Sequence, residues 1–524
     1  MNKSSLVSLQ MKSEEFLDQK IWEKISIASF LLCVIVIFVS TQNMQISRYF
    51  VPACILPMLV NMAFRKWDLV FRAIPDWLLF TAIFLQVSLF GYNIYLEYYS
   101  LSINFFDTGF FWNPIANFSN GRGFYNSELQ KSEFADHFCP GLLLIFTPLF
   151  SIFKNGIALH VIRLVFFSFS ILWFHNLLNF YGVSSGKRNF LLLLWVINVG
   201  VVNFLGFEFQ SSNLIVPFVF LLFHYYQLKK YVLFLLLSLF ILSLKENGSL
   251  VLISLGLFSI VYLNRIREGI VITFFGVLCL YAIPRILMPL LSGSEGVNDL
   301  AFDPFCCLRE KLTFVLLVLM CSGLFLIFYP KAILVVLPSM AASLLINRTG
   351  AHSLGFHYQD IPLAVSFAVL GFVVSKEKGV WPEAILKFPV FRIIAVVLFA
   401  GSFYRNHYSA NNYVQNYQIT RETRAAIEAI GKFKEKVDEG STIWAQTSLA
   451  FYLSNEYNIR CIMNENQTMM DTASNYIVLC DFASDHWPIR DHYEQMKNRL
   501  RLDVRSGIRK ELSEYYPLLI FERN

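Results

Sequence analysis

The sequence is poor in charged residues. Only 15% of its 524 residues are Asp, Glu, Lys or Arg, whereas 56% are hydrophobic. A soluble globular domain carries about 25% charged residues, so this composition argues against one. The basic residues, which leave a net charge of +6, are divided among short segments. They therefore give no case for a nucleic-acid partner and are more useful as a signal of membrane topology.

Several motifs are also missing. The nine cysteines show no C-x-x-C pair and no zinc-ligand spacing, and only a Cys461–Cys480 disulfide stays open. We find no Gly-rich phosphate loop, internal repeat or low-complexity tract. Residues 1–24 carry both charge signs, and no small-residue cleavage site follows the first apolar run. We therefore expect no cleaved signal peptide.

What the sequence does contain is a series of apolar runs of roughly 15–22 residues, the length that spans a bilayer. They predict a mostly α, polytopic helical membrane protein with about 13 transmembrane helices. The predicted spans are 25–41, 49–64, 77–96, 157–180, 189–205, 213–228, 231–244, 248–263, 270–290, 313–329, 332–346, 361–375 and 388–404.

The basic residues of the short loops predict the orientation. With a cytoplasmic N-terminus, the inside loops hold thirteen Lys and Arg residues and the outside loops hold seven. This holds only if 138–153, which contains Pro140 and Pro148, is an interfacial helix that does not cross. Because the acidic and His residues were not counted, their convergence is independent support for a site at the outer ends of the spans, where the rare ionisable and His residues gather. They are Asp107, His137, Glu208, Lys245, Glu246, Asp303, His357 and, beside them, Tyr358.

The pattern changes after residue 404. An amphipathic helix pattern at 419–437 is followed by alternating strand-like and helical stretches, which predict a small α/β domain. We expect strands at 441–446, 459–463, 475–481 and 515–523, and helices at 447–454 and 488–500. The odd number of crossings places this domain outside the membrane. The expected organisation is a cytoplasmic segment (1–24), an additional transmembrane hairpin (25–76), a transmembrane domain (77–404) with its first large outer loop at 97–156, and an extracytoplasmic α/β domain (405–524).

Asp107 is the first candidate for chemistry. It stands between Phe106 and Thr108 at the exit of a predicted span, where a carboxylate is costly to desolvate unless it is used or paired. It could act as a general base whose pKa is held up by partial burial. The alternative is a helix N-cap for an interfacial helix that starts near Phe110.

Glu208 and the Lys245–Glu246 pair come next. Glu208 is flanked by two aromatics and is either a second, substrate-binding carboxylate or a solvated loop residue. Lys245 follows a long apolar run. It either meets a phosphate, with Glu246 orienting it, or forms an ion pair with Glu246 at a helix end.

Two arginines lie inside apolar runs near their outer ends, Arg163 and Arg285. Each would pair with a lipid phosphate or simply snorkel to the interface. Three further positions are candidates for substrate contacts: Arg122 in an Asn-Gly-Arg-Gly turn, Asp136–His137 before the next apolar run, and His357–Tyr358. Since no H-E-x-x-H spacing exists, a structural or substrate-contacting His is favoured over a metal ligand.

The motifs F-D-x-G-x-F, N-G-R-G-x-Y, D-H-F-x-P-G, F-E-F, L-x-V-P, K-E-N and H-Y follow one another over roughly residues 100–375. In this order they resemble an uncharacterised bacterial family of multi-spanning membrane proteins related to the GT-C glycosyltransferases. The resemblance implies a GT-C fold and a catalytic acid in the first outer loop, here Asp107. Trp112 stands where a second acid is often found, Gln210 to Ser212 replace a His-Pro-Glu run, and Asn247 replaces an acid. Fewer carboxylates weaken the case for a divalent metal cofactor, which is not indicated, and leave open an inactive member.

Taken with the sequence features above, the resemblance implies a glycosyltransferase in the bacterial cytoplasmic (inner) membrane. Its partners would be membrane lipids, a polyprenyl-phosphate-linked sugar donor and an acceptor that the sequence does not identify. Asp107 would be the base. The substrate-binding candidates are Arg122, Asp136, His137, Arg163, Glu208, Lys245, Glu246, Arg285, His357 and Tyr358. The alternatives are a transporter or flippase for lipids or lipid-linked sugars, with ionisable groups near the bilayer midplane, and a non-catalytic lipid-binding protein.

Overall fold

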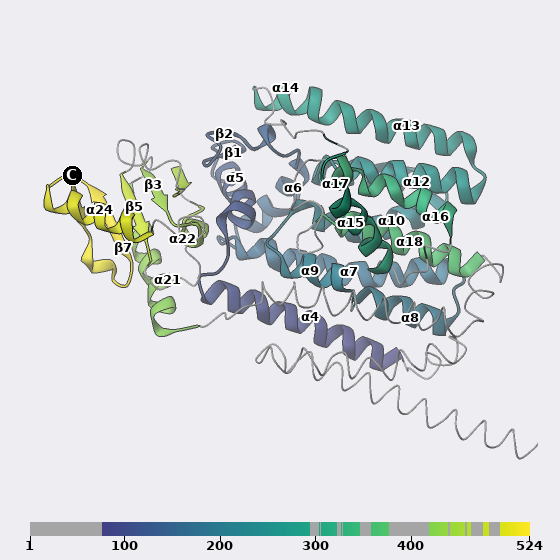
Figure 1. Cartoon of the computed structure of the whole chain (residues 1–524), viewed down its shortest axis with the longest axis horizontal. Coiled ribbons are helices and arrows are strands. Elements are labelled where there is room, and N and C mark those ends of the chain that lie inside the picture. The colour runs from purple at the N-terminus through teal and green to yellow at the C-terminus, as the bar shows by residue number, and fades with distance from the viewer. Residues whose placement is uncertain are drawn as a thin grey trace, which may run out of the picture.

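A computed structural model describes residues 76–196, 198–293, 303, 305–321, 326, 329–345, 358–376, 419–438, 441–455, 458–462, 475–480 and 493–524. A helical bundle carries a smaller α/β domain at one end (Figure 1). Three predicted spans (25–41, 49–64 and 388–404) lie outside the described residues, as do the segment 1–24 and His357.

A helix overlaps each of the ten predicted spans that fall within the described residues. The helices of the bundle are α4 (Asp76–Tyr99), α7 (Ile157–Phe180), α8 (Ser185–Val196), α9 (Val199–Gly206), α10 (Ile215–Gln227), α11 (Tyr231–Leu244), α12 (Gly248–Leu263), α13 (Ile266–Ala282), α14 (Met288–Ser292), α15 (Leu308–Cys321), α16 (Pro330–Val336), α17 (Ala341–Leu345) and α18 (Asp360–Lys376). Short turns precede or join several of them: η3 (Ser211–Leu214), η4 (Ile283–Leu287) and η6 (Leu337–Met340).

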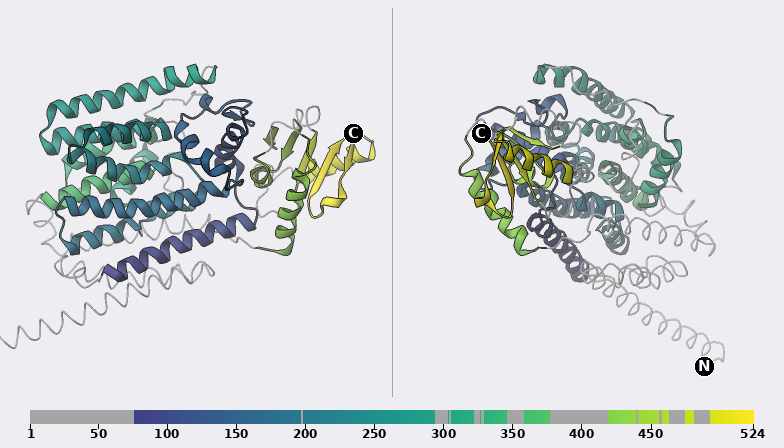
Figure 2. Two further views of the ribbon diagram at one scale, coloured as in Figure 1. Left: turned by 180° about the vertical axis from the view of Figure 1, so that it is seen from behind. Right: turned by 60° about the vertical axis from the view of Figure 1, so that its left-hand side comes forward.

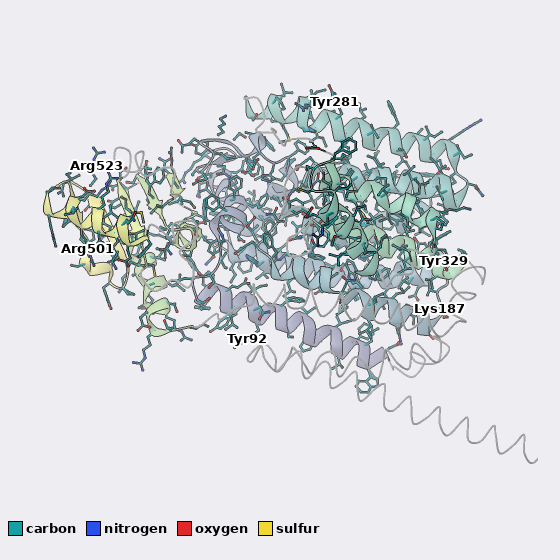
Figure 3. All side chains as sticks on the ribbon, viewed as in Figure 1. Tyr92, Lys187, Tyr281, Tyr329, Arg501 and Arg523 are labelled. Carbon is teal, nitrogen blue, oxygen red and sulfur yellow. The ribbon has the colours of Figure 1, made fainter. Side chains whose placement is uncertain are left out.

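Two helices of the described part are long and apolar enough to cross a membrane by themselves. They are Ile157–Phe180 and the continuous helix Ile266–Ser292, whose apolar windows are 44% and 11% buried. The second helix lies at the edge of the bundle, with side chains such as Tyr281 pointing outward (Figure 3). Large exposed apolar surfaces of this kind are typical of membrane contact. The crossing number of thirteen stays a prediction.

The bundle is held together by aromatic packing around α18, most of whose residues are buried. The ring of Phe174 stacks on Phe220 with centroids 4.6 Å apart, and Trp195 meets Phe220 and Phe367 edge-on at 5.2 Å and 5.1 Å. Such pairs stabilise a core beyond the area they bury. The four rings therefore tie α7, α8, α10 and α18 into one unit.

The segment between α4 and α7 forms a compact cap on one end of the bundle (Figure 2). It contains η1 (Phe105–Gly109), α5 (Phe110–Ser119), β1 (Tyr125–Asn126), β2 (Lys131–Ser132), η2 (Glu133–Ala135) and α6 (Pro140–Phe150). Helix α6 has 11 residues and is about 16 Å long, roughly half of a bilayer core of about 30 Å. Its placement along the membrane interface stays a prediction.

The C-terminal region contains a five-stranded sheet of order β4-β3-β5-β7-β6, in which β3 is parallel to β4 and β5 while β7 is antiparallel to β5 and β6. Its elements are α21 (Arg421–Lys434), β3 (Thr442–Ala445), α22 (Thr447–Tyr452), β4 (Asn458–Cys461), β5 (Tyr476–Leu479), α24 (Tyr493–Arg505), β6 (Arg509–Glu511), η10 (Ser513–Tyr515) and β7 (Leu519–Arg523). They overlap the expected strands and helices, but β7 begins four residues after the expected start at 515, and β6 and η10 were not expected.

The Cys461–Cys480 disulfide that the sequence left open is wrong. Both cysteines are buried and neither forms a disulfide. Cys461 ends β4 and Cys480 follows β5, and β3 lies between these two strands. Strands two places apart in a sheet are separated by about 10 Å, beyond the Cα distance that a disulfide allows.

The C-terminal domain packs on the segment that leads to η1. Leu101, Ile103 and Phe105 belong to the same apolar cluster as the residues of α21, α22 and β3. The indole N–H of Trp112 donates to Asn455 Oδ1 at 2.6 Å. Asn113 donates to the carbonyl of Ser454 at 2.8 Å. The chain just before Asp107 is therefore part of the core of the C-terminal domain.

Candidate functional site

Asp107 lies in η1, a short wide turn set up by its flanking residues. The side chain of Asn104 accepts a hydrogen bond from the N–H of Phe106 at 2.9 Å and so starts the turn. The next helix does begin at Phe110, but its N-cap is Gly109, which has no side chain to cap it. The alternative role of Asp107 as that N-cap is therefore wrong, and its carboxylate points to another element.

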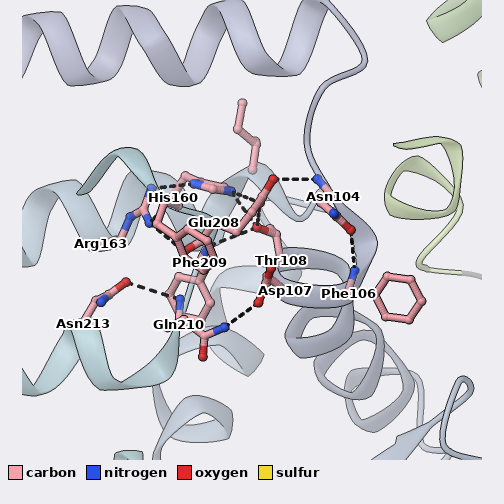
Figure 4. Close-up of polar contacts among 12 residues, drawn as sticks. Asn104, Phe106, Asp107, Thr108, His160, Arg163, Glu208, Phe209, Gln210 and Asn213 are labelled. Atoms are coloured by element: carbon pink, nitrogen blue, oxygen red, sulfur yellow. Dashed lines mark hydrogen bonds and ion pairs between the residues drawn. The ribbon is translucent and has the colours of Figure 1, made fainter. Parts of the chain in front are cut away.

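The side chain of Gln210 joins Asp107 to Lys245 (Figure 4 shows the Asp107 half of this contact). Its Nε2 donates to Asp107 Oδ1 at 2.7 Å, and its Oε1 accepts from Lys245 Nζ at 3.3 Å. These partners set the amide orientation, since a carboxylate only accepts and an ammonium only donates. Lys245 is 6% exposed and has an extended backbone between α11 and α12. An acid and a buried ammonium are thus one amide group apart.

Glu208 lies beside them, in the loop between α9 and η3. Its Oε1 accepts from the N–H of Asn104 at 2.7 Å, and its Oε2 accepts from the hydroxyl of Thr108. Thr108 also contacts His160 Nε2 at 3.0 Å and the N–H of Phe209 at 3.1 Å (Figure 4). The expected alternative of a solvated loop residue is wrong, because the carboxylate is held by η1.

Burial is the main influence on the pKa of Glu208. Desolvation raises the pKa of this carboxyl well above its usual range, and the negative charges of Glu97 and Asp107 raise it further. The hydrogen bonds from Thr108 and Asn104 stabilise the charged form and lower the pKa again. Asp107 and Glu208 are therefore neighbouring carboxyl groups in different environments, an arrangement common in acid–base sites.

Arg163 holds this corner of the site together. It is 3% exposed, and its Nη1 donates to the carbonyls of Phe207 at 2.5 Å and Glu208 at 3.1 Å. Its Nη2 lies 2.9 Å from His160 Nδ1. The snorkelling alternative is wrong for Arg163, because a guanidinium that caps loop carbonyls inside the protein does not reach for an interface.

A second polar cluster lies between η2 and α6. His137 Nδ1 is 3.2 Å from Glu133 Oε1 and 3.1 Å from Asp136 Oδ2. Burial lowers the pKa of His137, but the hydrogen bonds to these two carboxylates outweigh it and raise the pKa to about 10. The ring of Phe111 lies 5.1 Å from the ring of His137.

Phe111 and Lys245 connect the two clusters. The Phe111 ring also lies 5.6 Å from Phe209, which follows Glu208 in the loop. The positive charge of Lys245 is close enough to His137 to lower its pKa slightly. The structure thus brings seven of the predicted residues into one region: Asp107, Asp136, His137, Arg163, Glu208, Lys245 and Glu246.

Lys245 and Glu246 do not pair with each other. The carboxylate of Glu246 accepts from the N–H of Phe138 at 3.2 Å, whereas Lys245 bonds to Gln210. The predicted alternative of a helix-end ion pair is wrong. Glu246 instead anchors the start of α6, and Lys245 is free to face the side of Asp107.

Three predicted residues lie elsewhere. Arg122 bonds to Asn117 Oδ1 at 3.3 Å and lies beyond the far end of α5, a helix about 15 Å long, from Asp107. Arg285 is exposed on η4 and takes no part in the Asp107–Glu208 network. Tyr358 is half-buried just before α18.

Sequence reasoning missed five residues of this region. They are Thr108, His160, Gln210, Asn213 and Asp360, the last two joined at 3.0 Å between Nδ2 and Oδ2. One signal was present, because the i, i+3 spacing of His160 and Arg163 puts both on one face of α7. The others carry no local pattern. Within the described part of the chain, no three His, Cys, Asp or Glu side chains gather in a way that could hold a metal ion.

Comparison with known proteins gives one family. The sequence model described as "Predicted membrane protein (DUF2079)" matches residues 97–504, well over half of the chain. This range begins at the end of α4 and includes the whole region described above. No curated protein matches the sequence.

Proposed function

We propose that this chain, which belongs to the DUF2079 family of predicted membrane proteins, is a membrane glycosyltransferase of the GT-C type. It takes a sugar from a polyprenyl-phosphate donor and transfers it to an acceptor on the extracytoplasmic side of a bacterial inner membrane. The N-terminus is cytoplasmic, about thirteen helices cross, and the C-terminal domain is extracytoplasmic.

The link from Asp107 through Gln210 to Lys245 carries this proposal. A transfer from a lipid phosphate needs a base for the acceptor hydroxyl and a cation for the departing phosphate. Asp107 supplies the base, and the Lys245 ammonium supplies the cation. Among the described residues, the one hydrogen bond of Lys245 goes to the neutral Gln210. Arg122 and Arg285 are secondary candidates for the phosphate.

The reaction is a single displacement with inversion. The acceptor hydroxyl gives its proton to Asp107 as its oxygen bonds to the anomeric carbon. The bond from that carbon to the phosphate oxygen breaks, and its electron pair leaves with the lipid phosphate. Because a phosphate is a good leaving group, stabilising its charge matters more than protonating it. Glu208 and His137 hold sugar or acceptor hydroxyls.

The arrangement of the elements supports a site at one membrane face. The cap between α4 and α7 lies at the end of the bundle next to the C-terminal domain (Figures 1 and 2). The loop at Glu208 bonds to this cap directly, and the break at Lys245 bonds to it through Gln210. Helix α14 packs on η2 at the same end. A transporter would instead hold its ionisable residues near the midplane of the bilayer.

The decisive test is Asp107→Asn in membranes given labelled polyprenyl-phosphate sugars. Loss of a general base lowers the rate by about 10²–10⁴-fold, whereas the exposed Asp438→Asn control keeps wild-type transfer. Unchanged transfer by Asp107→Asn contradicts the assigned base. If the wild-type chain binds the lipid without turnover or moves it between leaflets, the non-catalytic or the flippase alternative replaces the enzyme.

A further inference from the structure

His160 stands between a group that can only donate hydrogen bonds and a hydroxyl group. Its Nδ1 lies 2.9 Å from Arg163 Nη2, and its Nε2 lies 3.0 Å from Thr108 Oγ1. A guanidinium has no acceptor, so His160 Nδ1 must accept and carries no hydrogen. The imidazole is therefore neutral with its hydrogen on Nε2, and it donates to Thr108.

The hydroxyl of Thr108 then uses all of its hydrogen-bonding capacity. It has two lone pairs and one hydrogen. The N–H of Phe209, at 3.1 Å, and the Nε2–H of His160 occupy the lone pairs. Its hydrogen is left for Glu208 Oε2, which must accept it. A chain of donors thus runs in one direction, from Arg163 through His160 and Thr108 to Glu208.

Glu208 receives this hydrogen bond without a cationic partner among the described residues. Its other oxygen accepts from the neutral N–H of Asn104 at 2.7 Å. Arg163 directs its Nη1 to backbone carbonyls, and His160, 3.8 Å away, is neutral by the argument above. The side chain is 18% exposed, so part of the carboxylate is accessible to a ligand.

We propose that Arg163 and His160 are positioning residues that, through Thr108, hold Glu208 as a hydrogen-bond acceptor for hydroxyl groups of a bound ligand. A carboxylate has about four lone-pair sites, and the two bonds described above leave others for ligand donors. A polyhydroxy ligand such as a sugar presents those donors. Only the identity of this ligand rests on the function proposed above, because the donor chain itself does not depend on it.

The groups facing Glu208 define how its protonation responds to mutation. They are Glu97 on α4, Asp107 on η1, His160 and Arg163 on α7, and Tyr452 on α22. Burial and the two carboxylates favour the protonated form, while the Thr108 hydroxyl favours the charged form. Removing that hydroxyl therefore moves protonation of Glu208 to higher pH.

Chemical modification tests this directly on the full-length protein in detergent. N,N′-dicyclohexylcarbodiimide reacts with protonated carboxyl groups in apolar surroundings, and mass spectrometry quantifies the adduct on the Glu208 peptide across a pH series. Glu208→Gln identifies the signal. The matched variants are Thr108→Ser, which keeps the hydroxyl, and Thr108→Val, which has the same shape without it.

We expect Thr108→Ser to keep the wild-type labelling midpoint. Thr108→Val is expected to raise it by about one to two pH units, the effect of losing a hydrogen bond to a charged group. Equal midpoints for wild type and Thr108→Val overturn the proposal. A shift in both variants also overturns it, because it shows a packing effect and no role for the hydroxyl.

The tautomer of His160 gives a second, independent readout. In magic-angle spinning spectra of protein with ¹⁵N-labelled histidine, subtraction of the His160→Gln spectrum isolates its two ring nitrogens. The wild type is expected to show an unprotonated Nδ1 and a protonated Nε2 at neutral pH. A hydrogen on Nδ1 overturns the proposal. Neither experiment needs a sugar donor, so failure of sugar transfer leaves both outcomes unaffected.

Discussion

The hydroxyl of Tyr452 donates a hydrogen bond to the backbone carbonyl of Tyr98, which joins the C-terminal domain to the end of α4. The rings of the two tyrosines lie 5.1 Å apart, and the following residues, Leu101 to Phe105, complete the core of the C-terminal domain. Asp107 comes two residues later. The C-terminal domain is therefore a support for η1 as well as a neighbour of the site.

Removing the hydroxyl in Tyr452→Phe leaves the Tyr98 carbonyl without this donor while keeping the ring. We expect a loss of about 1–3 kcal/mol in the free energy of unfolding, measured as a lower thermal midpoint in detergent. Tyr516 is 82% exposed, so Tyr516→Phe should stay within about 0.5 kcal/mol of wild type. Equal midpoints for the two variants would mean that the contact does not hold the domain.

Gly156 tests the same interface by adding atoms. A Cβ at this position would lie 2.6 Å from Phe451 and 3.1 Å from Trp112, on opposite sides of the domain contact. Because the backbone of Gly156 is helical, Gly156→Ala acts through crowding. It should lower the free energy of unfolding by about 1–3 kcal/mol.

Gly431 is the matched control, because a Cβ there meets nothing within 4 Å on α21. Gly431→Ala should stabilise the protein by about 0.5–1 kcal/mol. The measurement is the thermal midpoint of each variant relative to wild type. If the C-terminal domain packs on Trp112 as described, Gly156→Ala lowers the midpoint and Gly431→Ala raises it. If it does not, both midpoints change in the same direction.

Gln210→Glu replaces the hydrogen bond to Asp107 by a repulsive contact. The new carboxylate has no N–H to donate and places a like charge beside Asp107, while its contact with Lys245 can persist. In the proposed transfer reaction we expect a loss of about 10–100-fold in rate. Gln495→Glu on the exposed face of α24 is the charge-matched control. Wild-type transfer by Gln210→Glu would remove Gln210 from the working site.

His137 predicts a pH dependence of stability. Its pKa is about 10 in the folded protein, above the value of about 6.5 expected when unfolded. Since the folded state binds the proton more tightly, its contribution to stability is full below pH 6.5 and is lost as the pH rises to about 10.

The measurement is thermal unfolding of wild type and His137→Gln across this range. The difference between them should be largest below pH 6.5 and should shrink towards pH 10. Asp136→Asn removes one of the two carboxylates that raise the pKa of His137. In this variant the stability contributed by His137 should therefore be lost at a lower pH than in the wild type. A difference that stays constant from pH 6 to pH 10 would contradict the assigned ion pairs.

Local pattern was enough to predict much of the helical architecture. The apolar runs are long, and breaks such as Lys229–Lys230 and Asn264 interrupt them, so helix positions follow from residues near in sequence. The gathering of Asp107, His137, Glu208 and Lys245 in one region was also predicted, from a topology that assigns all four residues to the same ends of the expected spans. These properties depend on the order of residues and on the bilayer, and on little else.

The chemistry around those four residues was decided by tertiary structure. Gln210 became the bridge between Asp107 and Lys245 only because two loops and the break after α11 meet. The tautomer of His160 follows from Arg163 on one side and Thr108, 52 residues away, on the other. An amide, a hydroxyl or an imidazole can donate or accept, and only the neighbours that folding supplies determine which it does.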